Sequence, residues 1–150
     1  MITSIHQPSF FPWLGLLDKI AKSDYFVFLD DVSANKASYQ YRNTLLCNGS
    51  AKFLPLPVNY TMGVKLNELS YKNTYWIEEH IDKIINYYRK APFFYQIFPE
   101  IEKFYRNCEK MPPIDLIINS MKFCLEKFDI NIPSIRSSEL KYTGKKGDLV

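Results

Sequence analysis

The arrangement of apolar residues near the start of the chain limits the folds that this sequence can adopt. Residues 2–5 and 25–29 are short apolar runs rich in β-branched and aromatic side chains, which is typical of buried strands. Between them, residues 13–22 show the apolar spacing of an amphipathic helix. Two parallel strands require a crossover connection, which a helix can supply. The pattern therefore predicts a β-α-β unit and an α/β fold with a short, mostly parallel sheet.

Polar side chains follow each of the two apolar runs. His6 and Gln7 come after the first run, and Asp30 and Asp31 come after the second. Ligands of open α/β sheets bind outside the carboxyl ends of the strands, so we expect one crevice to hold these groups. His6 is a candidate general base, or its ring orders the following loop; Gln7 contacts a ligand or caps that loop. Adjacent strand residues point to opposite faces, so one of the two candidate catalytic aspartates faces the crevice.

The remainder of the chain adds a β-hairpin and a helical second half. Asn48-Gly49 separates two strand-like runs, residues 41–46 and 52–56, which is a strong hairpin signal. Residues 64–69 have the composition of another short strand, and His80 is expected at the surface or at the edge of the core. Apolar periodicity predicts three helices and then a last short strand, over residues 75–88, 94–108, 114–128 and 133–138.

Composition and charge exclude several classes of protein. The 150 residues fit a single α/β domain, and the net charge of +3 is dispersed, unlike the basic stripe of a nucleic-acid-binding protein. The three cysteines lack CxxC spacing, and the aspartates lack a third ligand, so we predict no metal site. No signal peptide and no apolar run near the roughly 20 residues of a membrane span are present, which predicts a cytoplasmic protein. Residues 141–150 have the pattern of a loop and a helix start, so we expect the domain to be incomplete at its C-terminus.

Further candidate ligand-binding residues surround the first predicted helix and the hairpin. Trp13 can stack on a base or sugar ring, although aromatic side chains more often bury themselves. Gly15 permits close approach of the backbone to a phosphate. Lys36 is a candidate anion contact on the loop before the hairpin. The guanidinium of Arg42 can bind a phosphate through two parallel hydrogen bonds, or it forms an ion pair with one of the aspartates. Asn43, the next residue in the strand, is a further candidate ligand contact.

The order of these segments resembles that of the WbqC-like protein family. The resemblance rests on IHQPSFFPWLGLLDKI at 5–20, DYFVFLDDV at 24–32, YQYRNTLLCNGSAKFLPLPV at 39–58 and YWIEEHIDKIINYYRKAPFF at 75–94. It covers most of the chain in order. It implies an α/β fold and a role in the synthesis of O-antigen and other surface polysaccharides, close to the modification of sugar nucleotides. It specifies neither a reaction nor a cofactor.

The first residues also resemble, more remotely, the start of HxGH-type nucleotidyltransferases. In those enzymes a strand, a Pro-containing loop and a helix N-terminus hold the phosphates of a nucleotide. Aligning residues 12–16 on that motif places Leu14 and Leu16 where the two histidines belong. Leucine can neither donate a hydrogen bond nor stabilise charge on a phosphoryl group, so the sequence argues against nucleotidyl transfer by that mechanism.

Three functional hypotheses follow from these observations. The leading one is a transferase acting on a nucleotide-linked sugar or another activated phosphate-containing substrate. In it, His6 is the base, Lys36 and Arg42 bind the anion, and Asp30 or Asp31 positions ribose or sugar hydroxyls. The alternative is a non-catalytic binding or scaffold protein for an enzyme of the same pathway, which the abundant tyrosines favour. A degenerate HxGH-type nucleotidyltransferase is the second alternative.

Overall fold

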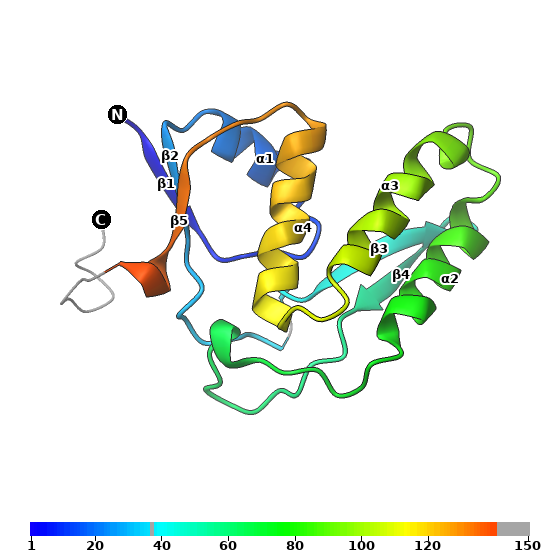
Figure 1. The fold of residues 1–150 in the computed structure, drawn as a ribbon, viewed down its shortest axis with the longest axis horizontal. Coiled ribbons are helices and arrows are strands. Elements are labelled where there is room, and N and C mark those ends of the chain that lie inside the picture. The colour runs from blue at the N-terminus through cyan, green and yellow to red at the C-terminus, as the bar shows by residue number, and fades with distance from the viewer. Residues whose placement is uncertain (37, 141–150) are drawn as a thin grey trace.

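The computed structural model contains the β-α-β unit that the sequence predicts (Figure 1). β1 (Thr3–His6) leads through a loop into α1 (Leu14–Ala21), and β2 (Tyr25–Phe28) pairs in parallel with β1. β5 (Ser134–Arg136) pairs in parallel with the other side of β2, which gives the strand order β1-β2-β5. The short parallel sheet and the α/β class are therefore confirmed.

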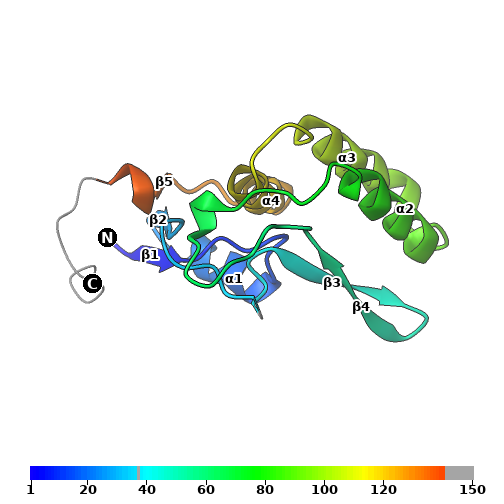
Figure 2. The ribbon, with the colours of Figure 1, turned by 90° about the horizontal axis from the view of Figure 1, so that it is seen from below.

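Helices α1 and α4 (Pro113–Lys127) cover the same face of this sheet (Figures 1 and 2). Ser4 Oγ lies 2.5 Å from the hydroxyl of Ser23, which follows α1, and Arg136 forms an ion pair of 2.5 Å with Asp115 of α4. The register places Ser4 and Arg136 on one face of the sheet. Both crossovers advance in the same direction across the sheet, and right-handed crossovers then place their helices on the same face.

The predicted hairpin is confirmed as β3 (Arg42–Cys47) and β4 (Ser50–Pro55). Its turn residues Asn48 and Gly49 have φ angles of +49° and +76°, as a tight hairpin turn requires. The hairpin lies at the end of the molecule remote from the parallel sheet, beneath the helices that follow it in the view of Figure 2.

The helical second half is also confirmed. α2 (Trp76–Tyr88) and α3 (Phe94–Asn107) pack beside the hairpin, and α3 contains Pro99 in its second turn. The prediction of a strand over residues 64–69 is wrong, because this segment contains the 3-10 helix η1 (Leu66–Glu68). The carboxylate of Glu68 accepts a hydrogen bond of 3.0 Å from the N–H of Lys65, and this local bond favours a turn over strand pairing.

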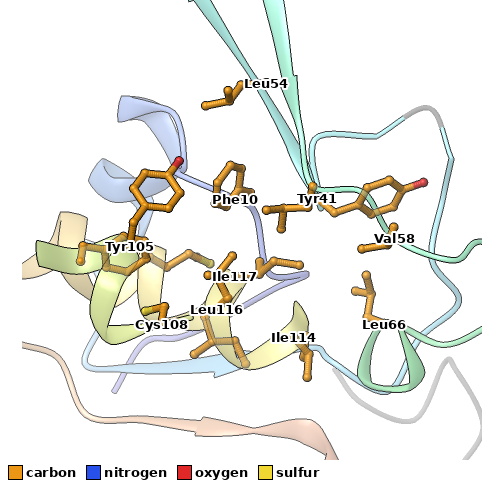
Figure 3. Close-up of a cluster of buried hydrophobic side chains, with 14 of the residues drawn as sticks. Phe10, Tyr41, Leu54, Val58, Leu66, Tyr105, Cys108, Ile114, Leu116 and Ile117 are labelled. Carbon is orange, nitrogen blue, oxygen red and sulfur yellow. The ribbon is translucent and has the colours of Figure 1, made fainter. Parts of the chain in front are cut away.

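One hydrophobic cluster joins the two parts of the fold. Figure 3 shows Phe10 at its centre, between Tyr105 of α3 and Tyr41 at the start of the hairpin. Phe10 and Tyr105 are 1% and 0% exposed. The loop between β1 and α1 is therefore held by core packing from two separate parts of the chain.

The structure describes residues 1–36 and 38–140. The expected loop and helix start at residues 141–150 lie outside the described residues. Within the described part, no helix combines the length and the apolar character needed to cross a bilayer.

Candidate functional site

His6, Trp13 and Gly15 meet where β1 ends and α1 begins. The ring of His6 lies edge-on to the indole of Trp13, with 5.5 Å between the ring centroids. Trp13 immediately precedes the helix and is 55% exposed. A Cβ atom at Gly15 would lie 2.9 Å from Trp13 Nε1, so the indole rests against the glycine. The structure thus brings together three residues that the sequence predicted as functional.

The hydrogen bond of the His6 ring determines which nitrogen can accept a proton. His6 Nδ1 lies 2.7 Å from the main-chain oxygen of Gln7. A carbonyl oxygen only accepts hydrogen bonds, so Nδ1 carries the hydrogen and Nε2 carries the lone pair of the neutral ring. In this state His6 Nε2 can accept a proton from a substrate hydroxyl.

An aromatic cavity lies beside Trp13. Its volume is about 270 Å³, and its walls come from the β1–α1 loop, the start of β3 and the loop before β3. The lining residues are Ser9, Phe10, Phe11, Trp13, Tyr39, Asn43 and Thr44. Trp13 and Tyr39 supply two large, partly exposed rings, and Thr44 supplies a hydroxyl group. The Ser9 hydroxyl donates to the carbonyl oxygen of Tyr39 at 3.1 Å. We call this space the aromatic cavity. Its lining suits a flat ring that carries hydrogen-bonding groups, such as a nucleobase or a sugar.

Arg42 places a positive charge beside this cavity. Its guanidinium carbon lies 5.5 Å from the ring centroid of Tyr39 and 4.5 Å from that of Phe53. These cation–π contacts orient the side chain next to a ring that lines the aromatic cavity. Asn43 instead uses its amide internally, because Nδ2 donates to the carbonyl oxygens of Phe10 and Phe11 at 3.2 and 2.6 Å.

Gln7 connects the end of β1 to the loop that carries Lys36. Its Oε1 accepts a hydrogen bond of 2.7 Å from Nε2 of Gln40, and Gln40 Oε1 accepts one of 2.7 Å from the N–H of Asn35. The amide oxygen of Gln7 therefore anchors the loop that contains Asn35 and Gln40, not the loop that directly follows Gln7. Lys36 is exposed on this loop, which leads to Tyr39 at the aromatic cavity.

The two aspartates form a separate cluster with the serines that follow β5. Asp30 is 0% exposed, and its carboxylate accepts hydrogen bonds from the N–H and hydroxyl of Ser138 at 3.0 and 2.8 Å. Ser137 Oγ lies 2.5 Å from Asp31 Oδ1 and 3.1 Å from Asp30 Oδ1. Asp30 thus joins the carboxyl ends of β2 and β5 from a position that solvent does not reach, whereas Asp31 is partly exposed. The alternation of strand side chains predicted that only one aspartate faces the crevice, but the Ser137 hydroxyl contacts both carboxylates.

A family model places this chain among known proteins. The model of the WbqC-like protein family matches residues 7–150, which include the aromatic cavity and both aspartates. The chain belongs to the WbqC-like protein family. Searches of curated proteins and of solved structures found no match.

In this WbqC-like chain, the positions of the two leucines at the start of α1 explain the departure from the HxGH pattern. Leu14 is 68% exposed and points away from the core, whereas Leu16 is 1% exposed and belongs to it. The second position is therefore a packing position in this fold. Neither side chain can contribute to phosphoryl chemistry at the helix N-terminus.

Two cations at the carboxyl edge of the sheet were missed by sequence analysis. Lys19 Nζ donates a hydrogen bond of 3.0 Å to the carbonyl oxygen of Ile5, directly before His6. Arg136 lies in register with Phe28, which is in register with His6, so His6 and Arg136 occupy one row of the sheet. Lys19 has no local sequence signal, because an exposed helical lysine is common. Arg136 is a polar residue that directly follows an apolar residue of the predicted last strand. His6 was identified by the same signal, a polar residue after an apolar strand.

His80, expected at the surface or the edge of the core, is instead 1% exposed within it. Its Nε2 donates to the carbonyl oxygen of Pro55 at 3.0 Å, and its Nδ1 accepts from the hydroxyl of Tyr105 at 3.2 Å. Burial lowers the pKa of His80 to about 4, so the ring is neutral at pH 7. Among residues 1–36 and 38–140, no three His, Cys, Asp or Glu side chains lie close enough together to hold a metal ion.

Proposed function

We propose that this chain is a transferase acting on a nucleotide-linked sugar or another activated phosphate-containing substrate in surface-polysaccharide synthesis. The observation that carries the proposal is the contact of His6 with Trp13, the residue whose indole also lines the aromatic cavity. It combines a proton acceptor with a surface on which a base or sugar ring can stack. Membership of the WbqC-like family supports the choice of pathway. The cytoplasmic location stays a prediction.

Each candidate residue has a distinct role in this proposal. His6 Nε2 removes the proton of an acceptor hydroxyl as its oxygen attacks the activated centre of the donor, and the phosphate-containing group leaves with the electrons of the broken bond. Arg42 and Lys36 stabilise the negative charge of the leaving phosphate. Asp31 accepts hydrogen bonds from ribose or sugar hydroxyls, while buried Asp30 positions the two strand ends.

The proposal is tested by ligand-dependent thermal melts against a panel of nucleotides and nucleotide sugars. A ligand present at 100 times its Kd stabilises the native state by about 2.7 kcal/mol, which raises the Tm by several degrees. Trp13→Ala is expected to abolish the shift, and His6→Ala to abolish turnover of the selected donor while the fold persists. Thr3→Ala, an exposed substitution on the same strand, is the control. A melt that no nucleotide or nucleotide sugar shifts contradicts the proposal.

The exposed aromatic residues of the second half favour one alternative, a scaffold protein for an enzyme of the pathway. Tyr75, Phe93 and Tyr95 are 75%, 62% and 81% exposed, and aromatic residues are enriched at protein interfaces. This alternative predicts stable co-purification with a pathway enzyme that Tyr95→Ala weakens, together with the absence of nucleotide binding.

A further inference from the structure

A second cavity, of about 400 Å³, lies between the hairpin and the helices α2 and α3. Leu45 and Leu54 line it from the two strands, Ile84 from α2, and Phe94 and Ile101 from α3. We call this space the apolar pocket. Its volume falls within the range of small-molecule binding sites, roughly 300–1,000 Å³. His6, Asp31 and Arg136, at the carboxyl ends of the parallel strands, do not line it.

The polar side chains that line the apolar pocket already have hydrogen-bond partners within the protein. Tyr88 Oη accepts a hydrogen bond of 2.8 Å from the N–H of Leu46, and the Tyr105 hydroxyl contacts His80. Asn43 binds the carbonyl oxygens of the loop before α1. No charged side chain of the described residues lines the pocket. A charged or strongly polar ligand group would lose its hydration there without compensation, so the lining selects an apolar ligand.

The apolar pocket adjoins the aromatic cavity, because Phe11 and Asn43 line both. Phe11 has a φ of +48°, and its N–H donates to the buried hydroxyl of Ser120 at 3.0 Å. Its carbonyl oxygen accepts from Asn43. Phe11 and Asn43 together thus form the boundary between the two spaces, and hydrogen bonds hold the main chain of Phe11 on both sides. The Arg42 guanidinium lies beside the aromatic cavity, 5.5 Å from the ring centroid of Tyr39. An apolar pocket next to a cavity with a cation beside it fits a molecule with one anionic or polar end and one hydrocarbon chain.

We infer that the apolar pocket binds the aliphatic chain of a small amphiphile whose polar end lies at the aromatic cavity. The pocket opens to solvent beside Phe93 and Ile97, which are 62% and 54% exposed. A small molecule is the occupant proposed, because the lining converges from the hairpin, two helices and Phe11 on a volume within the range of small-molecule sites. The inference does not depend on the proposed transferase chemistry, since it requires only the two cavities and their common boundary. It extends the range of ligands beyond nucleotides to molecules that carry an acyl or other aliphatic chain.

The test is a fluorescence titration of the full chain with dansylated undecanoate, followed by displacement with unlabelled dodecanoate. Ala91 lines the pocket, so Ala91→Phe fills space that would hold at least two methylene groups and weakens binding roughly tenfold or more. Ala51→Phe is the matched control, because Ala51 is exposed on the hairpin and does not line the pocket. Circular dichroism checks that both variants fold.

Saturable binding that dodecanoate reverses, that Ala91→Phe weakens and that Ala51→Phe leaves within about twofold supports the inference. Dansylglycine, which lacks the chain, should bind much more weakly. Three results would overturn it: no saturable binding, equal binding of dansylglycine, or wild-type affinity in Ala91→Phe. Sedimentation showing a dimer that Ala91→Phe dissociates would also overturn it, in favour of an interface. The nucleotide-sugar melt on the same samples reports separately on the proposed transferase.

Discussion

The side-chain amide of Asn43 donates a hydrogen bond of 2.6 Å to the main-chain carbonyl oxygen of Phe11. This contact joins the first strand of the hairpin to the loop between β1 and α1. Phe11 has a φ of +48°, a conformation that costs energy for a residue with a side chain. The surrounding hydrogen bonds and packing therefore maintain the loop shape that forms both cavities.

Replacing Asn43 with Ala is expected to lower the free energy of unfolding by about 1–3 kcal/mol. The substitution leaves the carbonyl oxygens of Phe10 and Phe11 without the amide that they bind. Urea unfolding followed by circular dichroism measures the change. Asn67→Ala is the control, because Asn67 is exposed on η1. Equal effects of the two substitutions would show that the Asn43 amide does not maintain the loop.

Replacing Gly15 with Ala is expected to displace the indole of Trp13, because the added Cβ atom would lie 2.9 Å from its Nε1. Acrylamide quenching of tryptophan fluorescence measures the change. The other tryptophan, Trp76, is 2% exposed and contributes little to quenching. Leu14→Ala, at an exposed helix position, is the control. Gly15→Ala should change the quenching constant and weaken the binding of any ligand of the aromatic cavity. The substitution should not lower the stability of the helix, because alanine has the higher helix propensity. Quenching identical to that of the wild type would contradict this placement of the indole.

The stability of the protein is expected to fall between pH 7 and pH 4 partly because of His80. In the unfolded chain the ring takes up a proton near its ordinary pKa of 6.5, whereas burial lowers the pKa to about 4 in the folded state. The unfolded state therefore binds more protons in this range, and the contribution is lost as the pH falls. In full, His80 contributes about 3 kcal/mol to this fall in the free energy of unfolding.

Proton NMR of the two histidines tests this prediction directly. His6→Asn assigns the two signals, and the His80 signal should titrate well below pH 6. Urea unfolding of His80→Gln should then show a flatter dependence on pH than the wild type, even if the variant is less stable at pH 7. A His80 signal that titrates near 6.5 would contradict the buried, neutral ring.

Replacing Asp30 with Asn is expected to destabilise the fold by about 2–3 kcal/mol, because hydrogen bonds to a charged acceptor are the stronger kind. The carboxylate of Asp30 accepts hydrogen bonds from the N–H and hydroxyl of Ser138 within the core. A thermal melt measures the change, and Asp82→Asn, at an exposed position of α2, is the control. An unchanged Tm for Asp30→Asn would show that this carboxylate does not hold the strand ends together.

The elements with strong local signals could be predicted from the sequence. The apolar runs around residues 13–22 predicted the parallel pair, and Asn48-Gly49 predicted the hairpin turn. The 64–69 segment was misassigned because a short apolar run does not distinguish a strand from a 3-10 turn held by one side-chain bond. His80 was misplaced because a polar residue is expected on the exposed face of an amphipathic helix. Only its contacts with Pro55 and Tyr105 show that the imidazole lies on the buried face.

The fold class, the hairpin and the position of His6 at the end of a strand could be read from the sequence, because each depends on residues that are neighbours along the chain. The contacts among His6, Trp13 and Gly15, and the distant groups around them, are known only from the folded structure. The tertiary structure brought Asn43 and Tyr39 to the β1–α1 loop, placed Arg136 in the row of His6, and buried Asp30 against Ser138. The physical reason is that such contacts depend on how sheet, hairpin and helices pack together, and local spacing carries no information about that packing.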